Sequence, residues 1–116
     1  MRKWVVEMIS RRHFDEEIGS IVSQLVRLYK PQNVILFGSL AKGEINEGTD
    51  MDLFIIKSDP PELGVDRIRE LDAMIKYTLA TDFVVYRPDA VEKRLSLGDP
   101  FIKNTLQEGR VLYDAA

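Results

Sequence analysis

Residues 35–56, ILFGSLAKGEINEGTDMDLFII, hold two apolar runs that flank a glycine-rich loop ending in Asp50 and Asp52. The first run is short and bounded by turn residues, which predicts a buried strand over 33–37. The second run predicts another strand over 51–56. Carboxylates beside such buried strands cost free energy unless a partner offsets their charge. This stretch therefore predicts two strands with a charged site where the loop between them ends.

Helical and strand-like segments alternate along the rest of the chain. Apolar residues at helical spacing predict a helix over 14–29 that Pro31 ends, while the first dozen residues are compatible with a short helix or a strand. Further helices are expected over 66–79, 89–97 and 100–108, and further strands over 82–86 and 110–113. This order predicts an α/β (α+β) sandwich in which helices pack on a small mixed sheet.

Charged and capping residues refine two of these helices. Asp99 and Pro100 form an N-cap and N1 pair for the helix over 100–108, and Gly109 follows as its C-terminal cap. In the helix over 66–79, charged residues fall opposite the apolar stripe and are expected on its solvated face. These residues are Arg67, Arg69 and Glu70.

The composition indicates one globular domain over residues 1–116. Of the 116 residues, 45% are hydrophobic and 30% are charged, which is typical of a globular chain, and no apolar run approaches the ~20 residues that a membrane span needs. The chain has no cysteine, which excludes a disulfide framework and a thiolate metal site. The N-terminus does not resemble a signal peptide, so we expect a cytoplasmic protein with no membrane partner.

The charge balance argues against a nucleic-acid partner. The chain has 16 basic and 19 acidic residues, a net charge of -3, whereas nucleic-acid-binding domains are usually basic. A metal site built from three aspartates would account for the whole acidic excess.

Three aspartates are candidates for such a metal site. Asp50 and Asp52 are two residues apart, so on one strand they point to the same face. Asp82 opens the strand over 82–86 and comes close to this pair if the two strands are neighbours. Three clustered carboxylates repel one another unless cations sit among them, and oxygen ligands of this kind suit Mg²⁺ or Mn²⁺. A magnesium ion would in turn bring a nucleoside triphosphate.

The residues after the first strand are candidates for binding the phosphates. Gly38 permits a close backbone approach or a positive φ, and Ser39 offers a hydroxyl and a backbone N–H. A helical turn beginning here would aim further N–H groups at an anion. Lys42 lies three residues after Ser39, on the same side of such a turn, and adds a positive charge.

Each of these features alone has a common structural interpretation. A Gly-Ser pair after a strand is usually a turn, and a lone aspartate before a strand is usually a solvated cap. Asp-x-Asp also occurs in calcium-binding loops, but here no glycine and terminal glutamate follow at the required offsets. The functional interpretation depends on the combination: strand, Gly-Ser, ten residues, Asp-x-Asp on a strand, helix, and aspartate on a strand.

This combination resembles the nucleotidyltransferase superfamily related to DNA polymerase β, and in particular its small members, the minimal nucleotidyltransferases. Gly38-Ser39, ten residues and then Asp50-Met51-Asp52 match the family motif, and Asp82 matches the third carboxylate of the family. The resemblance covers residues 14–113. It departs at one position, because members often carry a basic residue directly after Gly-Ser, where this chain has Leu40.

The resemblance implies a polymerase β-like fold and a two-metal mechanism. Asp50 and Asp52 would bridge two Mg²⁺ ions, and Asp82 would help to hold the catalytic ion. Gly38, Ser39 and Lys42 would bind the phosphates of ATP, the substrate. The reaction would move a nucleoside monophosphate, expected to be AMP, onto a hydroxyl.

The resemblance also implies a protein partner. Small members are often encoded beside a HEPN-domain protein, a helical ribonuclease toxin, and act as its antitoxin, in some cases by adenylylating a tyrosine of the toxin. The first hypothesis is therefore a protein adenylyltransferase of a type VII toxin–antitoxin pair. The alternative is a non-catalytic nucleotide-binding or partner-masking module, which the leucine at position 40 favours. A polymerase or tRNA-modifying enzyme is disfavoured by the acidic balance. A small sheet also leaves an edge or an apolar face at which a homodimer can form.

Overall fold

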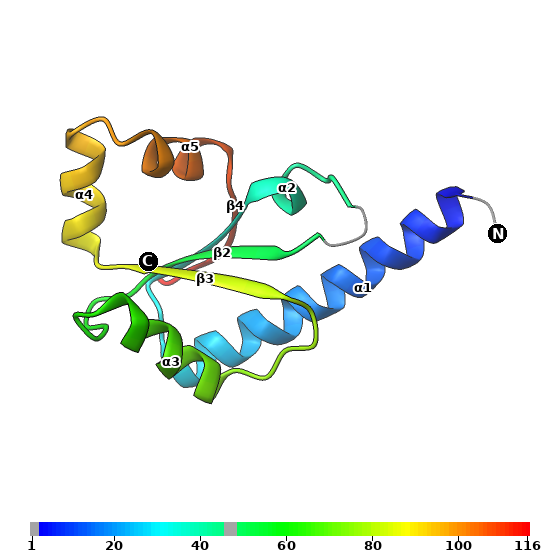
Figure 1. The fold of residues 1–116 in the computed structure, drawn as a ribbon, viewed down its shortest axis with the longest axis horizontal. Coiled ribbons are helices and arrows are strands. Elements are labelled where there is room, and N and C mark those ends of the chain that lie inside the picture. The colour runs from blue at the N-terminus through cyan, green and yellow to red at the C-terminus, as the bar shows by residue number, and fades with distance from the viewer. Residues whose placement is uncertain (1–2, 46–48) are drawn as a thin grey trace.

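The computed structural model describes residues 3–45 and 49–116, and for residues 3–10 the backbone alone. The helices are α1 (Lys3–Gln24), the π-helix η1 (Leu25–Tyr29), α2 (Gly38–Ala41), α3 (Gly64–Met74), α4 (Pro88–Ser96) and α5 (Pro100–Glu108), and the strands are β1 (Asn33–Phe37), β2 (Met51–Ile56), β3 (Thr81–Tyr86) and β4 (Arg110–Asp114). The strands cross the middle of the molecule, with α1 and α3 on one side and α4 and α5 on the other (Figure 1). The predicted α/β class is confirmed.

The four strands form one mixed sheet in the order β3-β2-β1-β4. β1 runs antiparallel to both of its neighbours, β2 and β4. β2 and β3 run parallel, and because a parallel pair needs a crossover connection, α3 lies between them in the chain. Both β2 and β3 consequently begin at the same end of the sheet.

Side-chain alternation along the strands divides the core into two layers. Met51, Leu53 and Ile55 of β2 belong to the larger hydrophobic cluster, which α1, η1 and α3 complete. Phe54 belongs to a second cluster with Val91 of α4 and Ile102 of α5. Since neighbouring residues of a strand point to opposite faces, Asp52 lies on the face that α4 and α5 cover in part.

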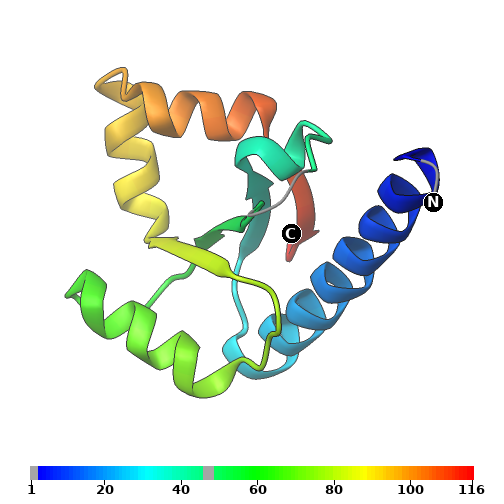
Figure 2. The same cartoon turned by 45° about the vertical axis from the view of Figure 1, so that its right-hand side comes forward.

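The helix predicted over 14–29 is longer than expected at its N-terminal end. The undecided first dozen residues belong to α1 from Lys3 onward, and α1 continues into η1. Lys30 then adopts a left-handed conformation with φ 56°, and its N–H donates to the carbonyl of Leu25, which ends the helix before Pro31. Figure 2 shows the N-terminal end of α1 projecting beyond the sheet.

The helix predicted over 66–79 ends earlier, so the prediction for its last five residues is wrong. α3 stops at Met74, and Ile75 is extended although its buried side chain continues the apolar spacing. Side chains of α1 hold the segment that follows: Gln24 accepts a 2.8 Å hydrogen bond from the N–H of Lys76 and donates a 2.8 Å hydrogen bond to its carbonyl. These tertiary contacts replace the bonds that another helical turn would have made.

The segment from α4 to β4 agrees with the sequence prediction. The Oδ1 atom of Asp99 accepts hydrogen bonds from the N–H groups of Phe101 and Ile102, so Asp99 is the N-cap of α5 as expected. β4 is paired with β1 and completes the sheet. Among the described helices, none combines the length and apolar character that a membrane crossing requires.

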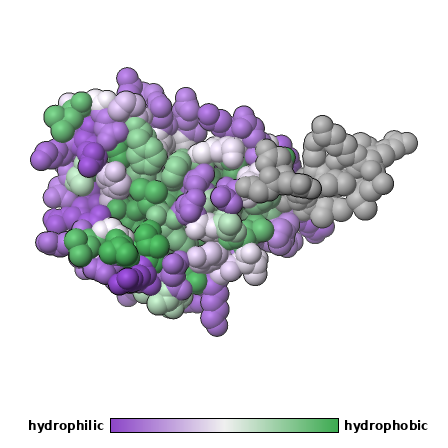
Figure 3. Space-filling model, in the orientation of Figure 1, coloured by the Kyte–Doolittle hydropathy of each residue, from purple (hydrophilic) through white to green (hydrophobic). Residues whose placement is uncertain are grey.

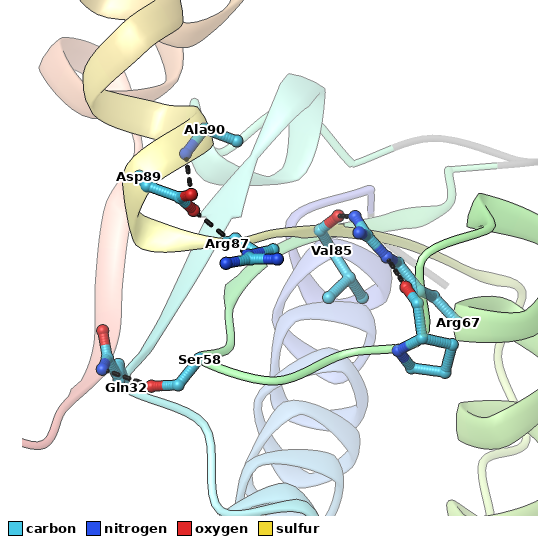
Figure 4. Close-up of polar contacts among 8 residues, drawn as sticks. Gln32, Ser58, Arg67, Val85, Arg87, Asp89 and Ala90 are labelled. Atoms are coloured by element: carbon cyan, nitrogen blue, oxygen red, sulfur yellow. Dashed lines mark hydrogen bonds and ion pairs between the residues drawn. The ribbon is translucent and has the colours of Figure 1, made fainter.

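Arg67 differs from the prediction that it lies on a solvated helix face. Its Nε donates to the carbonyl of Pro61, and its Nη1 donates to the carbonyl of Val85 in β3 at 2.9 Å (Figure 4). Arg67 thereby joins α3 and the loop before it to the outer side of β3. Arg69 does follow the prediction, since it makes only an exposed 3.9 Å ion pair with Asp66.

Replacing Arg67 should therefore destabilise the fold, whereas replacing Arg69 should not. Arg67→Ala removes two charge-assisted hydrogen bonds to backbone carbonyls, and we expect the free energy of unfolding to fall by about 1–2 kcal/mol. Arg69→Ala is the matched control and should change it by less than about 0.5 kcal/mol, as exposed ion pairs contribute little. Urea denaturation measures both, and equal losses would contradict the structural role of Arg67.

Candidate functional site

Two of the predicted site residues, Asp52 and Asp82, face each other at the beginning of the parallel strands β2 and β3. They occupy the same register position in the pair. Neighbouring strands lie about 4.8 Å apart, and both side chains point to the α4/α5 face. Asp52 is partly buried and Asp82 is exposed. The expectation that these strands are neighbours is confirmed.

Asp50 lies beside this pair but not in the strand. β2 begins at Met51, so the expectation that Asp50 and Asp52 share the strand fails by one residue. Asp50 is exposed, and its charge still acts on Asp52. Among the described residues, no three His, Cys, Asp or Glu side chains are grouped closely enough to hold a metal ion.

The environment of Asp52 disfavours its charged form. Burial raises the pKa of Asp52 above its usual 3.8, and the charges of Asp82 and Asp50 raise it further, as does a side-chain hydrogen bond with Asp82. A carboxylate whose protein neighbours all oppose ionisation is one that a cation would stabilise strongly.

Gly38 forms the wall of the site next to Asp52. β1 ends at Phe37, which pairs with Asp52, so the chain turns into α2 directly beside the carboxylate. Gly38 has φ 76°, and a Cβ atom at this position would collide with Oδ2 of Asp52. Both properties restrict the position to glycine, as the sequence predicted.

The predicted helical turn after β1 is present as α2, which contains Ser39 in its first turn. The carbonyl of Ser39 accepts hydrogen bonds from the N–H groups of Lys42 (3.1 Å) and Glu44 (3.0 Å), which fix the turn. Leu40 is buried in the larger hydrophobic cluster, 8% exposed. A basic side chain there would have to enter the core, so the local packing accounts for the leucine.

Lys42 follows α2 and points away from the core. Its side chain is exposed, and it helps to line a cavity of about 210 Å³ between α2 and α5. Phe37 and Gly38 lie on one side of this cavity, and Phe101 and Asn104 of α5 lie on the other. Lys42 therefore shares a cavity wall with Gly38, whereas the aspartates do not line this cavity.

Aromatic residues next to the carboxylates are the part of the site that the sequence motif did not include. The ring of Phe101 lies 5.5 Å from that of Phe37 and 6.1 Å from that of Phe54, and Phe54 lies 5.3 Å from Tyr86. These rings lie on the same sheet face as Asp52. Alternation along the strands is the sequence signal that could have placed the strand residues on this face, whereas no signal in the sequence placed Phe101 of α5 above them.

The chain is similar to known proteins in both sequence and structure. The family model described as "Nucleotidyltransferase domain" matches residues 18–113. A protein of Methanocaldococcus jannaschii named "Putative protein adenylyltransferase MJ0604" is 30% identical over 101 residues, which are 85% of this chain and 97% of that protein. A crystal structure described as "a putative nucleotidyltransferase from Sulfolobus solfataricus" superposes with a TM-score of 0.66 at 17% identity, covering 94% of this chain and 87% of that one. At this identity, the superposition shows a shared fold.

Neutralising Asp52 should stabilise the protein at neutral pH. Because the pKa of Asp52 is raised in the folded state, this state holds the proton more tightly, and the free energy of unfolding falls as pH rises above 3.8 through the raised value. Asp52→Asn has no titrating carboxyl group at this position, so its free energy of unfolding does not fall in this way. After allowance for solvent screening, we expect a gain of roughly 0.5 kcal/mol, or about 2–4 °C in Tm, at pH 7.

The gain should disappear below about pH 3.8, where Asp52 is protonated in both states. Asp15→Asn, which changes an exposed aspartate of α1, is the control and should give no gain. Thermal unfolding followed by circular dichroism at several pH values provides the measurement. A gain of equal size at pH 3, or a loss at pH 7, would contradict the unfavourable charge of Asp52.

Proposed function

Because this chain belongs to the nucleotidyltransferase domain family, we propose that it uses a divalent metal ion to transfer AMP from ATP to a hydroxyl group of a protein. The observation that carries the proposal is the facing of Asp52 and Asp82 beside Gly38, which matches the order of the family motif. The adenylyl group and the protein acceptor are supported by the name of the relative from Methanocaldococcus jannaschii.

The donor atoms available at the site fit a hard cation. Asp50, Asp52 and Asp82 offer only carboxylate oxygens, and the pKa of Asp52 is raised by burial and by the charges of Asp82 and Asp50. Carboxylate oxygens suit Mg²⁺, and we assign these three residues as its ligands, with two ions as in related two-metal sites. When bound, the metal ions supply Lewis acidity and neutralise the charge of the phosphates.

The glycine-serine turn is proposed to bind the triphosphate. Gly38 has no side chain that would obstruct an approaching phosphate, and Ser39 adds its hydroxyl and N–H at the beginning of α2. Lys42 contributes a positive charge on the same side of the turn. Leu40 contributes none, so the metal ions and Lys42 must compensate most of the charge of the phosphates.

The reaction is a substitution at the α-phosphorus of ATP. The acceptor hydroxyl oxygen forms a bond to the α-phosphorus, the bond from that phosphorus to the α,β-bridging oxygen breaks, and pyrophosphate leaves. The hydroxyl proton passes to a carboxylate of the site, and Asp82 is the more exposed of the facing pair. The fixed positions of the carboxylates and the turn would supply most of the rate through orientation and electrostatic stabilisation.

The acceptor is proposed to be a tyrosine of a HEPN-type toxin, with this chain as the antitoxin of a type VII pair. This finer assignment rests on the resemblance to minimal nucleotidyltransferases and on the word "protein" in the name of the relative. A tyrosine hydroxyl on a partner is compatible with the exposed position of Asp82.

A second candidate function is non-catalytic masking of the partner, with or without bound nucleotide. Two observations favour it: Leu40 is buried where relatives often have a cation, and the described aspartates are not grouped as a complete metal site. The two candidates differ in whether loss of the carboxylates abolishes neutralisation of the partner.

Transfer of label from ATP to the product of the neighbouring gene tests the proposal. With Mg²⁺, [α-³²P]ATP should label the acceptor protein and [γ-³²P]ATP should not, because the pyrophosphate leaves. Asp82→Asn should reduce labelling by about a hundredfold or more, since it removes a charge required in the transition state. Asp66→Asn, a change at a half-exposed position on α3, should label as the wild type does.

Labelling by [γ-³²P]ATP would contradict adenylyl transfer, and equal labelling by Asp82→Asn would contradict the assigned site. The masking function predicts instead that no label is transferred, while Asp82→Asn still binds and inhibits the partner. A rise in Tm with ATP and Mg²⁺ then reports whether the nucleotide site is occupied at all.

A further inference from the structure

The outer edge of β3 is an open strand edge close to the proposed active site. β3 is the terminal strand of the sheet, and no described segment pairs with it on its outer side. In Figure 1 this edge faces the viewer between α3 below and α4 on the left. Exposed strand edges present unpaired N–H and C=O groups that can pair with another chain.

A groove of about 490 Å³ follows this edge. It is lined by β3 together with Gly64, Arg67 and Ile68 of α3 and Ala90 and Arg94 of α4. Exposed apolar side chains lie at one end of each helix, namely Leu63 and Val65 at the beginning of α3, and Leu95 and Leu97 at the end of α4. Figure 3 shows hydrophobic residues gathered over this part of the surface, between polar rims.

The backbone groups available along the edge follow from the pairing of β3 with β2. The carbonyls of Ala80 and Tyr86 accept hydrogen bonds from Met51 and Lys57, so even-numbered residues turn their backbone groups toward β2. Phe83 and Val85 therefore turn theirs outward. Arg67 occupies the Val85 carbonyl (Figure 4), which leaves the Val85 N–H and both groups of Phe83 as pairing sites. Phe83 is the residue next to Asp82.

The charged side chains that line the groove are both basic. Arg67 donates to two neutral carbonyls, which leaves its charge uncompensated by these contacts. Arg94 lies with its guanidinium carbon 5.7 Å from the ring centroid of Tyr86 and makes a 3.3 Å ion pair with Asp99. Its side chain is 54% exposed, so the remaining N–H groups of its guanidinium can donate to a second carboxylate. The groove is complementary to an apolar segment that carries acidic residues.

A second copy of this chain fits the groove less well than a different protein. Pairing two β3 edges around a twofold axis would bring the same residues together from both copies. Arg67 and Arg94 of one copy would then face arginines of the other, without acidic residues from the groove to offset them. The charge therefore favours a partner of different sequence.

We propose that the outer edge of β3 binds an extended, acidic peptide segment of the acceptor protein, which pairs with Phe83 and carries the acceptor hydroxyl toward Asp82. The identification of this segment as the acceptor rests on the proposed function. Side chains advance about 3.3 Å per residue along a strand, so a hydroxyl one or two residues from the Phe83 pairing position reaches the level of Asp82. Strand addition provides the affinity, and the arginines select acidic residues.

A peptide library tests the docking without requiring catalysis. The probe is a resin-bound library of N-acetylated ten-residue peptides, randomised except for a central tyrosine and screened without nucleotide or metal. The pool retained by the wild type should be enriched in Asp and Glu and in β-branched residues. The best peptide, labelled with fluorescein, should bind Arg94→Gln at least fivefold more weakly, and amide hydrogen exchange at Phe83 and Val85 should slow when it binds.

Lys93→Gln removes the same charge from the neighbouring position of α4, outside the groove lining, and should change affinity by less than twofold. Asp82→Asn, in which AMP transfer is expected to be strongly reduced, should still select acidic peptides, so failure of docking and failure of catalysis are distinguishable. A pool without acidic enrichment, or unchanged affinity of Arg94→Gln, would overturn the proposal. In the absence of peptide, amide exchange protection at Phe83 and Val85 could instead rise with protein concentration. That result would overturn the proposal and would indicate that a second copy of the chain occupies the edge.

Discussion

The pairing of Asp52 with Asp82 across two parallel strands is the interaction that defines the candidate site of this protein. The strand register places two like charges opposite each other, with Asp50 nearby, and burial raises the pKa of Asp52 together with these charges. Gly38 forms the other side, where a Cβ atom would collide with Oδ2 of Asp52. The protein thus holds negative charge in a confined place, and a divalent cation bound there would compensate that charge.

The rest of the fold keeps this pair in position. Alternation along β2 buries Leu53 and Ile55 against α1 and α3, so a shift of one residue in register would turn Asp52 into the core. The crossover through α3 makes β2 and β3 parallel, and it is this direction that brings both strand starts to the same end of the sheet. Arg67 strengthens the crossover from outside by joining α3 to β3. Stability of the core and geometry of the carboxylates are therefore two results of one register.

Much of this arrangement could be predicted from sequence, because strand alternation and glycine chemistry are local. The strands around Gly38 and Asp52, the positive φ of Gly38 and the Asp99 cap all follow from short patterns. What failed depends on tertiary contacts. The apolar spacing through Leu79 predicts a helix, but Gln24 of α1 binds Lys76 and ends α3 early. The sequence predicts that Arg67 is solvated, because its hydrogen bond to β3 forms only in the folded structure. The position of Phe101 over Phe37 likewise depends on how α5 packs on the sheet.

The pKa of Asp52, measured with and without Mg²⁺, tests directly whether these aspartates bind a metal ion. Side-chain ¹³C NMR titration of the labelled protein measures this pKa, with KCl at matched ionic strength as the control. We expect a pKa above the usual 3.8 in KCl and a marked fall on addition of MgCl₂, because a cation bound among the carboxylates favours the charged form. A pKa of Asp52 that is the same in MgCl₂ and in KCl would contradict the assignment of these aspartates as the metal site.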